Sequence, residues 1–164
     1  FQAINKIAAK YNIPVIEDNA QCFLSKHRGR EIGTIGHIAS WSFENSKHMS
    51  CGEGGIITTD DPHYAEMCRK VAGHGYKNLK ATEGQVRLNQ EIYQDPNYKR
   101  HDTLGWNYRL SEILAAVAVA QLEDLDEKVA LRKKNASIFL DVIDNSDMFT
   151  SQYVPEYCDH SYFT

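Results

Sequence analysis

The sequence predicts an α/β layered domain with a helical segment near its end. Apolar residues recur with helical spacing in several segments, and short apolar runs that end in polar residues or glycines lie between them. A helix followed by a short turn and an apolar strand is half of a βαβ unit, which is the building block of α/β proteins. These two observations predict the fold class.

The first predicted helix covers the opening residues and leads into a strand. Pro14 ends the helix, and the apolar pair 15–16 begins a short buried strand that finishes in polar groups at Asp18 and Asn19. The apolar face of this helix has the spacing i, i+3, i+4 and i+7 and consists of Ile4, Ile7, Ala8 and Tyr11.

Two further strands and a second helix follow. Residues 38–43 and 56–59 are predicted strands, with glycine-rich loops before and between them. Asp61 and Pro62 form a helix start, because the aspartate can cap the first N–H groups and the proline lacks an N–H that would be unpaired there. Gly73 is placed to end this helix.

The remaining chain contains one long irregular stretch and two helices. Residues 76–104 show no periodicity, and loops of this length are uncommon unless they are functional or disordered. Ser111 can cap the next helix. Residues 126–145 resemble one long helix that directly follows.

Composition excludes several classes of protein. The 164 residues carry 18 Lys and Arg against 22 Asp and Glu, a net charge of −4, with no basic tract that would suit nucleic acid. No apolar run approaches the length of a membrane span. Four scattered cysteines without a Cys-x-x-Cys pair match no zinc pattern and favour a reduced, cytoplasmic setting without a metal site.

The densest group of candidate site residues lies between 17 and 55. Asp18 ends a predicted strand, where α/β proteins place ligand-binding groups, and Lys47 follows the next strand. A glycine turn at 52–55 closes the segment. Each feature alone has an ordinary explanation, namely a loop aspartate, a solvated surface lysine and a tight turn.

Several short sequence blocks follow one another along the chain. The earlier blocks are VIEDNAQ at 15–21, GTIG at 33–36, Ser42-Phe43-x-x-x-Lys47 and GEGG at 52–55, and the later ones are His74-Gly75 and Gly105-Trp106-Asn107-Tyr108-Arg109. Together and in this order, these motifs closely resemble the DegT/StrS family of nucleotide-sugar aminotransferases.

The resemblance implies an aspartate-aminotransferase-like fold, that is, fold type I of the pyridoxal phosphate (PLP) enzymes. Residues 1–125 would form the second half of the PLP-binding large domain. Residues 126–164 would form the long connecting helix and the start of the C-terminal small domain. The chain is therefore expected to be the central segment of a longer subunit, with its phosphate cup and stacking residue before Phe1.

The resemblance also implies a role for each matching residue. Lys47 would hold PLP as an internal aldimine and act as general acid and base, for which a lysine that can lose its charge is suited. Asp18 would pair with the pyridine nitrogen and Gln21 would hydrogen-bond near the phenolic oxygen of the ring. Ser42 would contact the cofactor phosphate, and Asn107 would reach that phosphate from the neighbouring subunit of a homodimer.

The implied function is PLP-dependent transfer of an amino group from L-glutamate to a nucleotide-linked ketosugar, in the biosynthesis of polysaccharide or antibiotic sugars. Some relatives carry histidine at the lysine position and perform dehydration; Lys47, with His48 beside it, favours amino transfer here. The alternatives are another PLP reaction on the same fold, such as sugar dehydration, and a non-catalytic binding or assembly domain.

Three positions depart from the family pattern. Asn19 and Cys22 stand where small residues such as alanine are common, and His37 stands where an acidic residue is typical. These departures bear on the substrate and not on the cofactor. Residues 76–101 form a longer stretch than the family pattern suggests and could shape the sugar or nucleotide pocket.

Overall fold

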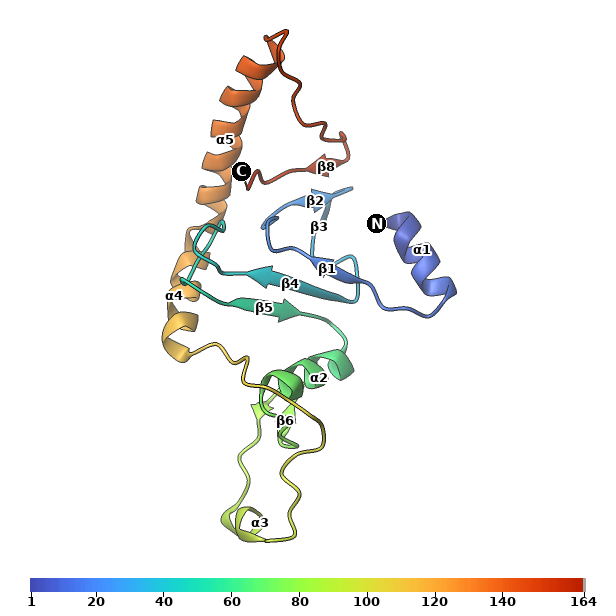
Figure 1. Cartoon of the computed structure of the whole chain (residues 1–164), viewed down its shortest axis with the longest axis vertical. Coiled ribbons are helices and arrows are strands. Elements are labelled where there is room, and N and C mark those ends of the chain that lie inside the picture. Colours follow the sequence, from blue (N-terminus) through green and yellow to red (C-terminus); the bar gives the residue numbers. More distant parts are fainter. Residues whose placement is uncertain (164) are drawn as a thin grey trace. The chain divides into compact units, whose positions relative to one another are not determined.

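The computed structural model describes residues 1–163, which fold into two compact units. Unit 1 consists of Phe1–Ile56 and the chain from Ser111 onward, and unit 2 consists of Ile57–Leu110. Figure 1 follows the alternation of helices and strands along the chain, which confirms the predicted α/β class. The expected division into 1–125 and 126–164 follows a different boundary and stays a prediction.

The main sheet has the strand order β1-β4-β5. β1 (Ile16–Asp18) and β4 (Ile38–Ser42) are parallel, and Asp18 lies opposite Ser40. β5 (Gly55–Thr58) lies on the other side of β4 and runs in the opposite direction (Figure 1). Residue 55 must be a glycine, because a Cβ there would lie 2.5 Å from the backbone oxygen of Trp41.

A second, small sheet joins distant parts of unit 1. β2 (Lys26–His27) and β3 (Arg30–Glu31) form a hairpin, and β8 (Cys158–Asp159) pairs antiparallel with the free side of β2. The glycine pattern predicts a loop here, and strands of two residues carry no sequence period that would reveal them.

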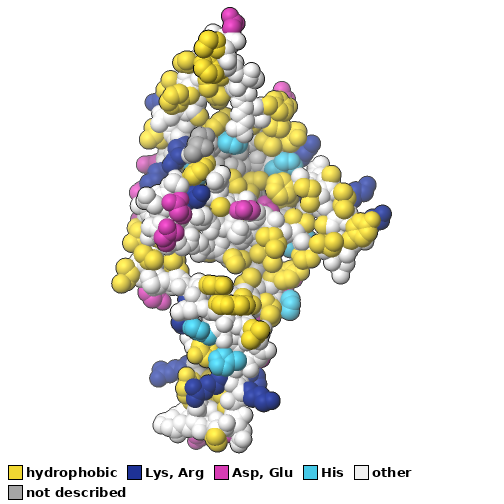
Figure 2. All heavy atoms as spheres, in the orientation of Figure 1, with side chains coloured by type: hydrophobic (Ala, Val, Ile, Leu, Met, Phe, Trp, Pro, Cys, Tyr) yellow, Lys and Arg dark blue, Asp and Glu magenta, His cyan; other side chains and the backbone are white. Residues whose placement is uncertain are grey.

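The apolar core is small and lies wholly in unit 1. Of the apolar face predicted for α1 (Gln2–Lys10), only Ala8 is buried, and Ile4 and Ile7 are 58% and 61% exposed. Apolar side chains are correspondingly prominent on the surface in Figure 2. The buried apolar residues are Ala8, Phe23, Ala39, Phe43, Met49, Cys51, Ala118, Leu125 and Val129.

Unit 2 is built around α2 (Pro62–Ala72). As predicted, Asp61 caps this helix, accepting hydrogen bonds from the backbone N–H groups of residues 63 and 64. The stretch predicted to be irregular contains short ordered elements, namely the hairpin β6 (Leu79–Lys80) and β7 (Gly84–Gln85) and the helix α3 (Gln90–Gln94).

Two consecutive helices complete the fold. α4 (Glu112–Glu123) begins at the Ser111 cap as predicted, since the serine hydroxyl accepts from the N–H of Leu114. α5 (Leu125–Asp144) is the long helix expected at 126–145. Among the helices of residues 1–163, none combines the length and apolar character that crossing a bilayer requires.

Candidate functional site

The carboxyl ends of β1 and β4 form the edge at which Asp18 and Ser42 lie. Because the strands are parallel and Asp18 pairs with Ser40, both side chains belong to the edge where α/β folds bind ligands. The Asp18 carboxylate is exposed and accepts one hydrogen bond, from the N–H of Ala20 at 3.1 Å. The Ser42 hydroxyl accepts from the N–H of Glu44 at 3.2 Å.

The buried carboxylate of Glu17 fixes the loop at residues 33–36, which precedes β4. Glu17 is 3% exposed and accepts hydrogen bonds from the N–H groups of Gly33 (2.7 Å), Ile35 (2.8 Å) and Gly36. Its partners explain the GTIG block, which wraps one carboxylate. Sequence reasoning gave Glu17 no role, although a charged residue inside an apolar strand was the available signal.

Lys47 lies in the loop between β4 and β5. The Glu44 carboxylate accepts from both the N–H and the hydroxyl of Ser46, at 3.0 and 2.5 Å, and these hydrogen bonds lower the pKa of Glu44. The two ends of the loop are joined by a backbone hydrogen bond of 2.8 Å, in which the N–H of Phe43 donates to the oxygen of Gly54. The lysine is therefore presented by a loop that is tied at both ends.

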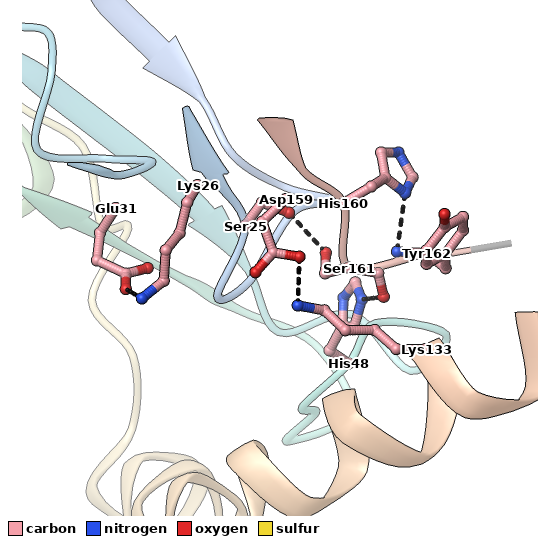
Figure 3. Close-up of polar contacts among 9 residues, drawn as sticks. All are labelled: Ser25, Lys26, Glu31, His48, Lys133, Asp159, His160, Ser161 and Tyr162. Atoms are coloured by element: carbon pink, nitrogen blue, oxygen red, sulfur yellow. Dashed lines mark hydrogen bonds and ion pairs between the residues drawn. The ribbon is translucent and has the colours of Figure 1, made fainter. Parts of the chain in front are cut away.

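The residue after Lys47 anchors this loop to the C-terminal tail. His48 is 3% exposed, and its Nε2 lies 3.2 Å from the backbone oxygen of Ser161 (Figure 3). A carbonyl only accepts, so Nε2 carries the proton in this contact. Burial lowers the pKa of His48, and its Nδ1 has no hydrogen-bond partner among the described residues.

The tail continues to the Lys47 side chain. The hydroxyl groups of Ser25 and Ser161 form a buried hydrogen bond of 2.8 Å (Figure 3). Two residues later, the ring centroid of Phe163 lies 4.4 Å from Nζ of Lys47, a distance typical of a cation–π contact. Nothing in the spacing of the sequence predicts that residues 161 and 163 meet this loop.

The residues that depart from the family pattern contact each other or the backbone. Asn19 is 2% exposed and its Oδ1 lies 3.4 Å from Sγ of Cys22, whose thiol pKa is raised by burial. Nδ1 of His37 accepts from the N–H of Val15 at 2.9 Å. Gln21, the predicted partner of the cofactor ring, is exposed in the loop after β1.

Asn107 belongs to unit 2 and forms a cluster of its own. Its Oδ1 accepts from Nε of Arg109 at 2.9 Å, and Nη2 of Arg109 lies 3.3 Å from Nε2 of His74. The two blocks predicted from the sequence meet here, because a Cβ on Gly105 would lie 2.2 Å from the backbone nitrogen of Gly75. Unit 1 thus holds Asp18, Gln21, Ser42 and Lys47, and unit 2 holds Asn107.

Comparison with known proteins identifies the family. The model of the DegT/DnrJ/EryC1/StrS aminotransferase family matches residues 1–164. The chain belongs to this family. The resemblance seen in the sequence motifs is thereby confirmed.

Two relatives in the family are named as enzymes of sugar metabolism. A UDP-2-acetamido-2-deoxy-3-oxo-D-glucuronate aminotransferase of Pseudomonas aeruginosa is 38% identical over 138 residues, which cover 84% of this chain and 33% of the relative. The GDP-perosamine synthase of Escherichia coli O157:H7 is 32% identical over 138 residues, with the same coverage of 84% and 33%. The chain therefore spans about one third of these curated relatives.

Solved structures of the family share the fold. The E. coli GDP-4-keto-6-deoxy-D-mannose-3-dehydratase with bound hydrated PLP matches with a TM-score of 0.80 at 26% identity, covering 99% of this chain and 41% of that one. A GDP-4-keto-6-deoxymannose-3-dehydratase with a trapped PLP-glutamate geminal diamine gives a TM-score of 0.79 at 27% identity, covering 98% and 41%. The expected fold type I architecture of PLP enzymes is confirmed.

The residues of the sheet edge fit PLP chemically. A primary amine can bond covalently to an aldehyde, and a carboxylate can stabilise a protonated ring nitrogen. Lys47 and Asp18 supply these two groups from the segments after β4 and at the end of β1. The hydroxyl of Ser42, at the same edge, is a suitable donor to a phosphate.

Proposed function

We propose that this chain carries the lysine of a PLP-dependent aminotransferase that moves an amino group from L-glutamate to a nucleotide-linked ketosugar. The observation that supports this most is the parallel pairing of β1 with β4, because Asp18 ends β1 at the same edge of the sheet from which the loop with Lys47 leaves β4. The relatives' names support the sugar substrate, and the PLP-glutamate structure supports the donor.

Each side chain has a defined task in this proposal. Asp18 would pair with the pyridine nitrogen, Gln21 would hydrogen-bond near the phenolic oxygen, and Ser42 would contact the phosphate. When bound, the cofactor supplies an electron sink for the substrate carbon that loses its proton. Nζ of Lys47 would hold the cofactor covalently and, as a free amine, would take up and pass on the proton of that carbon.

The quaternary part of the proposal assigns Asn107 to the neighbouring subunit's cofactor phosphate in a homodimer. Its support is that unit 2 holds Asn107 in a cluster separate from the four residues of unit 1. A cytoplasmic location is supported by the four cysteines, all of which are free thiols.

Dehydration is the second candidate function, because solved dehydratases share the fold. A histidine at the lysine position accompanies that reaction in the family. This chain has Lys47 there, and the neighbouring His48 directs its Nε2 to the oxygen of Ser161. These two facts favour amino transfer.

The test uses the complete protein loaded with PLP. We expect visible absorbance that borohydride abolishes, a pyridoxyl label on Lys47 by mass spectrometry, and 2-oxoglutarate released from glutamate with UDP- or GDP-linked ketosugars. Lys47→Ala should lose the label, and Lys6→Ala, which changes an exposed lysine of α1, should keep it. An uncoloured, unlabelled protein would contradict the proposal, and sugar dehydration without 2-oxoglutarate would establish the second candidate.

A further inference from the structure

Unit 2 contains a pocket of about 210 Å³ to which the proposed function has so far assigned no ligand. No aspartate or glutamate is among the described residues that line it. Its walls are aromatic and cationic, and the side chains that matter for its chemistry are Tyr76, Tyr93, Tyr98, Arg100 and Arg109.

Arg100 offers its guanidinium to this pocket. The group stacks on the ring of Tyr93, 4.8 Å from the centroid, and Nη2 lies 3.5 Å from the backbone oxygen of Tyr93. Among residues 1–163, every ion pair is made by a lysine, so no carboxylate neutralises Arg100. A guanidinium has five N–H donors, which leaves several for a ligand.

The tyrosines give the pocket flat walls and hydroxyl groups. Tyr76 is stacked on His101 with 4.8 Å between ring centroids and 22° between planes, which holds its ring in one orientation. Nζ of Lys77 lies 5.9 Å from the ring of Tyr98 and adds positive charge beside the pocket. Such walls suit a ring that carries hydroxyl groups and an anionic substituent.

Arg109 connects the pocket with Asn107. Its side chain lines the pocket, and its Nε donates to Oδ1 of Asn107. Under the proposed function, Asn107 contacts the cofactor phosphate. A ligand in the pocket would then lie next to the residue that unit 2 contributes to the reaction, which is where a substrate must be bound.

We propose that this pocket binds the nucleoside diphosphate part of the nucleotide-linked sugar. The diphosphate would be held between Arg100 and Arg109 by charge-assisted hydrogen bonds, and the adjoining ring would lie against the tyrosines. The assignment of this ligand rests on the proposed function. The long irregular stretch would thereby be the part of the chain that recognises the substrate's carrier group.

The experiment measures binding without turnover. UDP and GDP are titrated calorimetrically into the complete, PLP-loaded protein, with inorganic pyrophosphate and uridine as separate probes. Arg100→Ala should weaken UDP and GDP binding about tenfold or more, since a charge-assisted pair of hydrogen bonds is lost. The affinity for pyrophosphate should fall by a similar factor, and the affinity for uridine, which lacks phosphate groups, should not change.

Two further variants make the result specific. Arg100→Gln keeps a polar side chain and removes the charge of the guanidinium, and should show most of the loss of affinity, so that the effect of lost charge can be compared with that of the full truncation in Arg100→Ala. Arg87→Ala removes an exposed arginine from the same stretch outside the pocket and should bind UDP as the wild type does. Unchanged UDP affinity in both Arg100 variants, or equal losses in Arg87→Ala, would overturn the proposal. If the protein binds UDP through Arg100 but transfers no amino group, the proposed function would be wrong and the assignment of this pocket to a nucleoside diphosphate would stand.

Discussion

The two units of this chain are stabilised by different interactions. Unit 1 contains all nine buried apolar side chains of the described residues, whereas the buried side chain of unit 2 is the charged Lys70, at 7% exposure. Nζ of Lys70 lies 2.7 Å from the Glu66 carboxylate and 2.9 Å from that of Asp102. Unit 1 therefore depends on burial of apolar area, and unit 2 depends on ion pairs and backbone hydrogen bonds.

Each unit also buries one charge, and the partners differ in kind. Glu17 of unit 1 is held by backbone N–H groups, which neither titrate nor rotate away. Lys70 of unit 2 is held by carboxylates that titrate and are 30% and 38% exposed. The comparison predicts that unit 1 tolerates salt better than unit 2 does, because dissolved ions screen the partly exposed carboxylates of Glu66 and Asp102 more than buried backbone hydrogen bonds.

Glu17→Gln should have the largest effect on stability. The substitution removes the charge and one acceptor while three N–H donors remain, so we expect the free energy of unfolding to fall by about 3 kcal/mol. Urea unfolding of the complete protein measures this. Glu53→Gln, at an exposed position of the glycine turn, is the matched control. Equal stability of the two variants would show that Glu17 does not hold the 33–36 loop.

Lys70→Met should have the next largest effect, confined to unit 2. Two charge-assisted hydrogen bonds are lost, and because Asp102 is partly solvated we expect a local loss of about 1–2 kcal/mol. Amide hydrogen exchange should quicken in residues 57–110 and not in the β1-β4 pair. Lys99→Met, at an exposed position of unit 2, is the control. Faster exchange in both units would mean that they do not unfold separately.

Removing either of the two predicted helix caps should lower the free energy of unfolding by less than the substitutions above. Asp61 accepts from two N–H groups and Ser111 from one. Asp61→Ala should cost about 1 kcal/mol, and Ser111→Ala about half of that. Thermal or urea unfolding of both variants tests the order. A larger loss for Ser111→Ala would show that the number of capped N–H groups does not decide the cost.

The loss of stability of unit 2 in acid should be the smallest of the predicted effects. Hydrogen bonds to Lys70 lower the pKa of both Glu66 and Asp102. Their contribution is complete above the ordinary carboxyl pKa and is lost as the pH falls through the lowered values. The raised pKa of Lys70 matters only at strongly alkaline pH. Protection of the amides in residues 57–110, measured as the exchange rate relative to the intrinsic rate at each pH, should therefore fall below about pH 4, and protection that does not change with pH there would refute this.

Local signals let the sequence predict both ends of α2 and the start of α4, whereas the short helix α3 was missed. The Asp61-Pro62 start, the Gly73 end and the Ser111 cap are each made by neighbouring residues, and the structure has them at those positions. The strand 38–43 was also predicted, because a β-strand with apolar residues leaves a continuous pattern.

Contacts between distant residues left no such signal. Two such contacts are the pairing of β2 with β8 and the packing of Gly75 against Gly105. They join residues far apart in the sequence, and no periodic pattern of apolar residues marks either of them. At the candidate site, the motif resemblance predicted Lys47 and Asp18. It gave no indication of Phe163 beside the lysine, or of the buried carboxylate of Glu17, because a single sequence shows which residues are present and not which ones meet.

The pairing of β8 with β2 also affects how the chain is made. His48 obtains its hydrogen-bond partner from Ser161, 113 residues later in the sequence. On the ribosome, the loop that carries Lys47 is therefore synthesised long before the segment that anchors it, and one edge of β2 stays unpaired in that interval. During synthesis, the loop that carries Lys47 therefore gains the contact between His48 and Ser161 only after residue 161 has been added.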